Sequence, residues 1–304
     1  MGERERLCAA IEDRDLIEYF YLDQDMKGVF HTLEALDLRL DERPDVVPFN
    51  AAVKGYIGAV DGQGNPWIAK RAETKEALLY FRLCTLAYLI DHRLGTLAAP
   101  TGVAKIDSKL YRITKVVRNS IQIGSYNYLE EPYLEILRKD LLNRWLFFDE
   151  DRNPNNYLVV RNRKEKPFVV VIDYDKADLA SENMKITGDP DKFGWFRTEK
   201  TRFLSPLRPP NFEGVPIDVF ENRLKEMVSI TREELLGVAM PLLEGHASSD
   251  FAGKIVDLLL ARVKYIEEYF RRMFKSATET KNKCNDSDYS MFGASFIDMY
   301  KGKK

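Results

Sequence analysis

The stretch that decides the fold is residues 145–178, WLFFDEDRNPNNYLVVRNRKEKPFVVVIDYDKAD. Within it, Tyr157–Val160 and Phe168–Ile172 are short apolar runs rich in β-forming residues, and the polar segment between them ends in Pro167. This pattern predicts a β-hairpin with a loose turn. Because neither run alternates between apolar and polar residues, we expect both faces of the hairpin to be buried.

Three oxygen-bearing side chains flank this hairpin. Asn156 directly precedes the first strand, and Asp173 directly follows the second. Those two ends lie side by side in an antiparallel pair, and Asp151 precedes Asn156 in a turn rich in Pro and Asn. We therefore expect the three side chains to converge at one edge of the hairpin. The alternative is a solvated turn beside a core strand, because this Asp–Asn spacing is common in proteins.

Phosphoryl transfer from ATP requires this combination of groups. One carboxylate orients the attacking hydroxyl and accepts its proton, while an amide oxygen and a second carboxylate hold magnesium against the phosphates. The order Asp-x-x-x-x-Asn, a hairpin, and an apolar strand ending in Asp is the order used by protein-kinase-like folds.

The motif DRNPNN at 151–156, followed by VIDY at 171–174, resembles the catalytic core of HipA-type kinases. It is also similar to the Asp-Arg-His-x-x-Asn loop of phosphoinositide kinases. Typical eukaryotic kinases have His-Arg-Asp where this chain has Glu-Asp-Arg, and Asp-Phe-Gly where it has Asp-Tyr-Asp, which favours an atypical branch. The resemblance implies that Asp151 is the catalytic base, that Asn156 and Asp173 bind Mg²⁺, and that ATP is the donor.

A second part of the resemblance lies upstream. Pro66–Arg71 is predicted to be a strand carrying Lys70, similar to the Val-Ala-Ile-Lys strand whose Lys binds the α- and β-phosphates in kinases. The alternative is a surface Lys on an edge strand. Residues 74–93 are predicted to be a helix, and the resemblance implies that Glu76 pairs with Lys70, with Glu73 as the competing candidate. An acidic residue in a first turn is also favoured by the helix dipole alone.

The segment that would join two kinase lobes follows a third predicted strand, Tyr111–Val117. By order along the chain, the resemblance implies that adenine hydrogen-bonds to the backbone of Val116, Val117 and Arg118.

The remaining elements are predicted from periodicity and turn residues. Residues 1–45 are helical in character, including Leu36 and Leu40, and Ala51–Val60 reads as a strand. Residues 174–216 are rich in Gly and Pro and form either an activation or substrate-binding segment or a structural meander. Further helices are predicted at Tyr133–Phe148, Ile217–Val228, Thr231–Leu243 and Phe251–Lys275.

Composition excludes several classes of protein. The 304 residues are 45% hydrophobic and 31% charged with a net charge of -2, which fits a globular chain and argues against a dedicated nucleic-acid binder. No apolar run is long enough to predict a membrane span, and the N-terminus lacks the apolar core of a signal peptide. Cys8, Cys84 and Cys284 are scattered and odd in number, so a reducing cytoplasm is the expected location, and with the three scattered histidines they have no zinc-binding spacing.

We therefore predict an α+β, protein-kinase-like two-lobed fold. The predicted parts are a helical extension (1–45), a small sheet-containing N-lobe (46–118), a mostly helical C-lobe with the catalytic hairpin (119–275) and a polar tail (276–304). The predicted activity is ATP- and Mg²⁺-dependent transfer of the γ-phosphate to a hydroxyl, with a protein Ser or Thr as acceptor. The alternatives are a small-molecule or lipid kinase, a nucleotidyl (AMP) transferase on the same fold, and a non-catalytic pseudokinase or interaction module.

Overall fold

The computed structural model describes residues 2–41, 47, 49–128, 130–149, 154–181, 217–245 and 250–283. The chain divides into two compact units, residues 1–266 and residues 267–304. Among the described residues, the first unit holds the strands, the helices before α9 and the first half of α9, and it is the unit described below. The α+β class predicted from the sequence is confirmed. None of the helices described is long and apolar enough to cross a membrane.

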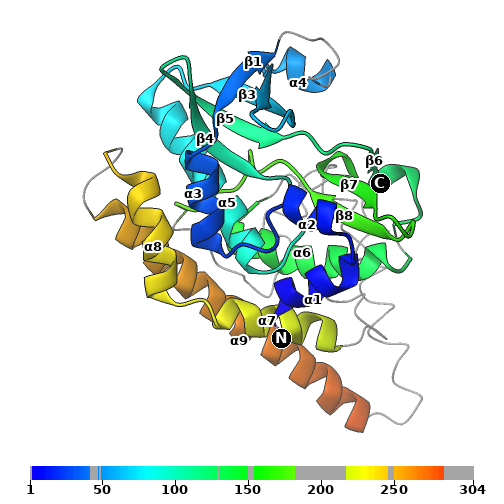
Figure 1. The fold of residues 1–304 in the computed structure, drawn as a ribbon. Helices are drawn as coiled ribbons and strands as arrows, with labels where there is room; N and C mark the ends of the chain where they lie inside the picture. Colours follow the sequence, from blue (N-terminus) through cyan, green and yellow to red (C-terminus); the bar gives the residue numbers. More distant parts are fainter. Residues whose placement is uncertain are drawn as a thin grey trace, which may run out of the picture. The chain divides into compact units, whose positions relative to one another are not determined.

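An antiparallel sheet of five strands forms in the first half of the chain (Figure 1). In spatial order its strands are β1 (Leu38–Asp41), β2 (Ile57–Asp61), β3 (Pro66–Arg71), β5 (Lys109–Lys115) and β4 (Thr101–Ile106). The β3–β5 register pairs Lys70 with Arg112. Because directly opposed residues of an antiparallel pair share a face, both cations lie on one side of this sheet.

Two helices pack beside β4 (Figure 1). α3 (Met26–Glu34) brings Leu33 against Gly102, where an added Cβ would lie 3.2 Å from the Leu33 side chain. α5 (Lys75–Arg93) starts at Thr74, whose hydroxyl accepts a hydrogen bond from the Ala77 amide at 3.1 Å. Such a cap satisfies one of the free amides of the first turn, which explains why the helix begins there.

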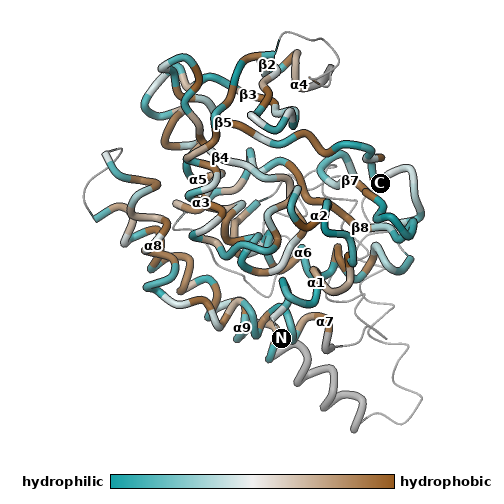
Figure 2. Tube along the Cα trace, viewed as in Figure 1, coloured by the Kyte–Doolittle hydropathy of each residue, from teal (hydrophilic) through white to brown (hydrophobic). Residues whose placement is uncertain are grey.

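The predicted hairpin supplies two of the three strands of a second sheet, whose order is β6 (Ile121–Gln122), β7 (Tyr157–Arg161) and β8 (Pro167–Val171). β8 is hydrophobic along its length (Figure 2), and residues 168–171 are buried. Val171 also exchanges backbone hydrogen bonds of 2.9 Å with Leu97 and Ala99. β8 is therefore bonded on both sides, which explains its continuous apolar sequence.

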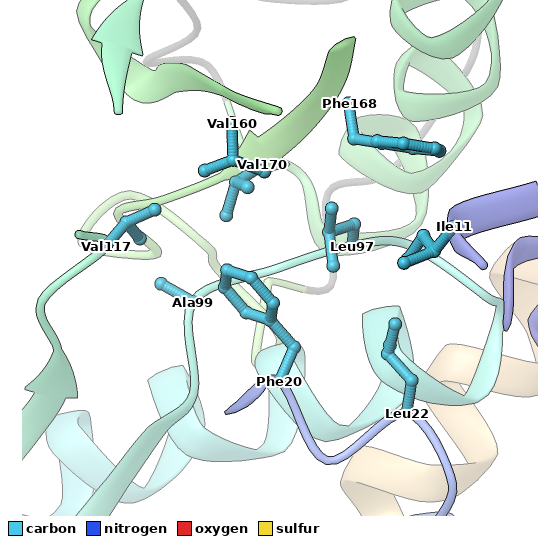
Figure 3. Close-up of a cluster of buried hydrophobic side chains, with 9 residues drawn as sticks. All are labelled: Ile11, Phe20, Leu22, Leu97, Ala99, Val117, Val160, Phe168 and Val170. Atoms are coloured by element: carbon cyan, nitrogen blue, oxygen red, sulfur yellow. The ribbon is translucent and has the colours of Figure 1, made fainter. Parts of the chain in front are cut away.

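The two faces of the hairpin are covered by different helices. α6 (Tyr133–Phe147) contacts β8 on one side. On the other side lies an apolar cluster supplied by α1 (Glu3–Ile11), α2 (Arg14–Tyr19) and the turn after them. Figure 3 shows Phe20 pointing toward Ala99 and Val170 in this cluster. The prediction that both faces are buried is thus confirmed.

Three more helices complete the described chain: α7 (Ile217–Val228), α8 (Arg232–Leu243) and α9 (Phe251–Lys283). Arg262 of α9 is fully buried and donates hydrogen bonds to the carbonyl oxygens of Leu146, Asp178 and Ser181 at 3.1, 3.0 and 2.6 Å. It therefore joins α9 to the end of α6 and to the segment that follows β8.

Some predicted elements are wrong. Leu36 and Leu40 fit a helical period, yet α3 ends at Glu34 and β1 pairs with β2, so tertiary pairing overrides the periodicity. The strand predicted from Ala51 starts only at Ile57, because α4 (Phe49–Val53) comes first and Gly55, with φ +79°, turns the chain.

Candidate active site

The hairpin brings Asn156 and Asp173 to one end of its two strands. Tyr157 opposes Val171 in the β7–β8 register, and the next pair outward is joined by the Ile172 amide, which donates to the Asn156 carbonyl at 3.0 Å. Asn156 is 8% exposed, whereas the Asp173 side chain is 28% exposed. Asp173 has φ +65°, in the left-handed region that Asp tolerates better than most residues. An amide and a half-buried carboxylate thus flank the hairpin end.

Asp151, the predicted catalytic base, lies outside the described residues. The described residues nearest to it are Asp149 on one side and a short 3₁₀ turn, Pro154–Asn156, on the other. Asp149 is 1% exposed.

A buried ion network anchors the chain on both sides of the site. Arg144 of α6 is fully buried and contacts the carboxylates of Asp149 at 3.2 Å, Asp140 at 3.1 Å and Asp91. Burial alone would lower the pKa of Arg144, but these three carboxylates hold it well above its usual value. Tyr174 donates to Asp91 at 2.7 Å. Asp149, two residues before Asp151, and Tyr174, directly after Asp173, are therefore held by one cluster.

The structure does not bring Lys70 together with either predicted glutamate. Lys70 is half-buried, with its Nζ 5.3 Å from the centroid of the Tyr56 ring. Glu76 is exposed in the first turn of α5, and hydrogen bonds from its own amide and from the Thr74 hydroxyl lower its pKa. Glu73 is exposed and lies 3.6 Å from Arg71. Within the described chain, no ion pair links Lys70 to a carboxylate.

Arg112 is the functional candidate that the sequence analysis missed. It is 3% exposed, its Nη2 lies 3.8 Å from the Asp173 carboxylate, and its Nη1 contacts the Asp175 carboxylate. Burial lowers the pKa of Arg112, but nearby Cys84, Tyr56 and Asp173 shift it upward overall. The available signal was a charged residue between two apolar ones in the strand sequence Tyr-Arg-Ile.

Several of the backbone groups assigned to adenine already have protein partners. The Val116 amide donates to Pro66 at 3.0 Å, and the Tyr19 hydroxyl donates to the Val116 carbonyl at 2.5 Å. The Ser120 hydroxyl donates to the Val117 carbonyl at 2.8 Å. A nucleotide base bound here would have to share or replace these hydrogen bonds.

The side chains on either side of this segment are also engaged. Lys115 is 2% exposed, and its Nζ lies 4.1 to 5.5 Å from the centroids of the Tyr19, Tyr21 and Trp67 rings. Burial lowers the pKa of Lys115 to about 8. Arg118 donates to the Gly64 carbonyl at 2.6 Å. The segment after β5 is therefore tied both to the N-terminal helices and to the β2–β3 turn.

The oxygen donors at the hairpin end suit a hard divalent cation. Mg²⁺ prefers carboxylate and amide oxygens, which Asp173 and Asn156 supply. In the described ranges, no group of three or more His, Cys, Asp or Glu side chains is placed to hold a metal ion. A complete site would therefore need ligands from elsewhere, such as Asp151, water or phosphate oxygens.

No family model and no curated protein sequence matches this chain. Solved structures that resemble it include CtkA, a proinflammatory kinase of Helicobacter pylori, with a TM-score of 0.46 at 12% identity over 74% of this chain and 96% of that chain. The N-terminal 618-residue fragment of LepB from Legionella pneumophila has a TM-score of 0.37 at 15% identity, over 70% of this chain and 46% of that one. WaaP in complex with acyl carrier protein has a TM-score of 0.26 at 14% identity, over 65% and 92%. Because all three TM-scores lie below 0.5, function has to be inferred from the side chains of the site.

Proposed function

We propose that this chain is an ATP- and Mg²⁺-dependent phosphotransferase that moves the γ-phosphate to a hydroxyl group. One observation carries the proposal: the side-chain amide of Asn156 and the carboxylate of Asp173 flank the same end of the β7–β8 hairpin. A backbone hydrogen bond from the Ile172 amide to the Asn156 carbonyl closes that end. The order of elements from β3 through α5, β5 and α6 to the hairpin supports it, because the resemblance to HipA-type kinases implies the same order.

Each side chain would have a distinct part in the reaction. Asn156 and Asp173 would hold Mg²⁺, which neutralises phosphate charge when bound. Asp151 would orient the acceptor hydroxyl and take up its proton. Lys70, a half-buried cation on the same sheet face as Arg112, would contact phosphate oxygens.

For the acceptor we propose a Ser or Thr hydroxyl of a protein, following the resemblance to HipA-type kinases. A small-molecule or lipid kinase would use the same residues, and a nucleotidyl transferase would move AMP from the same nucleotide. The mass added to the product distinguishes the two reactions, because a kinase adds phosphate and a nucleotidyl transferase adds AMP.

A second candidate is a non-catalytic interaction module. The observation in its favour is that the amide and carbonyl of Val116, assigned to adenine by the resemblance, are bonded to Pro66 and Tyr19. Such a module would keep the fold without binding nucleotide.

The test compares Asp151→Asn with Asp173→Asn. Loss of the base should leave Mg²⁺–ATP binding nearly unchanged and reduce phosphate transfer on the order of 10²–10⁴-fold. Loss of a metal-binding carboxylate should reduce both binding and transfer. Calorimetric titration with Mg²⁺–ATP measures binding, and γ-labelled ATP with a cell lysate measures transfer.

The matched control is Asp107→Asn, at an exposed turn between β4 and β5 where φ is +47°. Asn tolerates this backbone conformation, so the control should behave like the wild type. Full transfer activity in both site variants would reject the catalytic assignment. Absence of nucleotide binding by the wild type would favour the interaction module.

A further inference from the structure

Arg112 is a buried cation shared by two acidic residues that follow β8. Its Nη2 lies 3.8 Å from Asp173 Oδ1, and its Nη1 contacts Asp175 Oδ1. Its Nε is buried and has no hydrogen-bond partner among the described residues. The guanidinium therefore depends on these two carboxylates for charge compensation, because a buried charge left without a partner is strongly destabilising.

The two carboxylates are not equivalent. Asp173 Oδ1 accepts the Asp175 amide at 3.0 Å, which closes a tight turn between them. The Tyr80 hydroxyl of α5 donates to the Asp175 carbonyl, so the backbone of Asp175 is also held by α5. Asp173 lies at the hairpin end beside Asn156, and its carboxylate is farther from the Arg112 guanidinium than the Asp175 carboxylate is.

A conflict arises at Asp173 if it binds a metal, an argument that rests on the proposed function. A carboxylate beside a guanidinium is already neutralised, and a divalent cation nearby is repelled by that guanidinium. Metal binding would therefore compete with Arg112 for Asp173. This competition weakens metal binding only slightly if Arg112 keeps another counter-ion while Asp173 binds the metal.

We propose that Asp173 and Asp175 share Arg112 at rest, and that Asp175 alone keeps the Arg112 charge compensated when Asp173 binds the metal. Asp175 thus makes metal binding possible without touching the metal. Arg112 in turn makes the affinity of the site for metal depend on Asp175. The ion triad Arg112–Asp173–Asp175 sets the strength of metal binding at the hairpin end.

The test is a double-mutant cycle on metal binding. Mn²⁺, a spectroscopic substitute for Mg²⁺, is titrated by electron paramagnetic resonance into wild type, Asp175→Asn, Arg112→Met and Arg112→Met/Asp175→Asn. Asp175→Asn should weaken Mn²⁺ binding by about tenfold or more, because Arg112 then holds Asp173. In the Arg112→Met background the same change should cost less than about threefold, since the competitor is gone. Asp178→Asn, an exposed carboxylate three residues further along, serves as control and should stay within about threefold of wild type.

Each outcome is decisive. An equal loss from Asp175→Asn in both backgrounds would reveal plain charge repulsion and overturn the proposal. So would unfolding of every neutral Arg112 variant, Arg112→Gln included, even when combined with Asp175→Asn, because the pair would then be structural. A wild type that binds neither Mn²⁺ nor Mg²⁺–ATP would remove the proposed function and this inference together. Coupling between Arg112 and Asp175 in Mn²⁺ binding, without phosphate transfer to any acceptor, would support this inference and contradict the proposed phosphotransferase activity.

Discussion

At the scale of single residues, burial decides the charge of His92. This side chain lies in α5, is 1% exposed, and has its Nε2 2.9 Å from the carbonyl oxygen of Gln24. A carbonyl only accepts, so Nε2 carries the hydrogen. Burial outweighs this hydrogen bond and lowers the pKa of His92 to about 4. The folded protein therefore holds a neutral imidazole at neutral pH.

The stability of the protein should consequently fall with acid. In the unfolded chain His92 takes up a proton near its ordinary pKa of 6.5, but in the folded protein only near 4. Between these values the unfolded state binds more protons, so stability is lost as the pH falls. We expect His92 to contribute a loss of about 2 kcal/mol between pH 7 and pH 5.

His92→Gln keeps a donor for the Gln24 carbonyl and removes the titration. Urea unfolding at pH 7, 6 and 5 should give a flatter pH dependence for this variant than for wild type. His31→Gln, which changes an exposed histidine of α3, is the control and should retain the wild-type slope. Equal slopes for wild type and His92→Gln would contradict the assignment.

Single residues of the site also differ in whether their position could be predicted from the sequence. Asn156 and Asp173 could be located together because a hairpin fixes the positions of its two ends. Arg112 could not, since its carboxylate partners follow a strand of a different sheet and lie far along the chain. The predicted pairing of Glu76 with Lys70 does not form, because Glu76 lies in the first turn of α5, where its side chain is exposed.

At the scale of elements, the packing of α1 against the end of α5 depends on Gly95. This residue has φ +74°, and an added Cβ would lie 2.6 Å from the Arg4 amide nitrogen and 2.7 Å from the Glu3 carbonyl carbon. Both obstacles are backbone atoms of α1, so a methyl group cannot be accommodated by rotating a side chain. Gly95 therefore permits both the left-handed helix end and the close approach of α1.

Gly95→Ala should destabilise the protein by more than a left-handed alanine alone. Gly64→Ala is the matched control, because Gly64 has φ +78° and nothing within 4 Å of the added Cβ. The control should lose about 1–2 kcal/mol from backbone strain. Gly95→Ala should lose roughly 2 kcal/mol more, within the range typical of overpacking. Chemical denaturation of both variants measures the difference, and equal losses would show that α1 can shift without cost.

The elements themselves differ in how far local sequence determines them. α5 and α6 could be predicted because their apolar residues recur at helical spacing over many turns. β4 was missed, since Thr-Gly-Val-Ala-Lys-Ile contains residues that rarely form strands and gains its order from β5. β1 was mistaken for helix because its assignment depends on pairing with β2.

At the scale of the whole first unit, one buried network joins segments that are distant in sequence. Arg144 of α6 connects Asp91 of α5, Asp140 of its own helix and Asp149, two residues before Asp151. Tyr174, directly after Asp173, donates to the same Asp91. The Arg144 guanidinium and its carboxylate partners thus hold α5 and the segments around Asp149 and Tyr174 together.

Removing that guanidinium should therefore destabilise the unit far more than removing a similar one at the surface. Arg144→Met leaves three carboxylates in a buried setting without their cation, for which a loss of about 3–5 kcal/mol is expected. Arg232→Met is the control, since Arg232 of α8 pairs at 2.7 Å with Asp257 and the two side chains are 54% and 59% exposed. Exposed pairs of this kind contribute up to about 1 kcal/mol.

The pH dependence gives this prediction a second readout. Without Arg144 the buried carboxylates are harder to ionise, so their pKa values rise in the folded variant. The folded state then binds more protons than the unfolded state, and acid stabilises the variant relative to wild type. The difference in unfolding free energy between Arg144→Met and wild type should be smaller at pH 5 than at pH 7. A difference that stays constant with pH, or a loss no larger than that of Arg232→Met, would show that the charges of the network do not hold the residues on either side of the site.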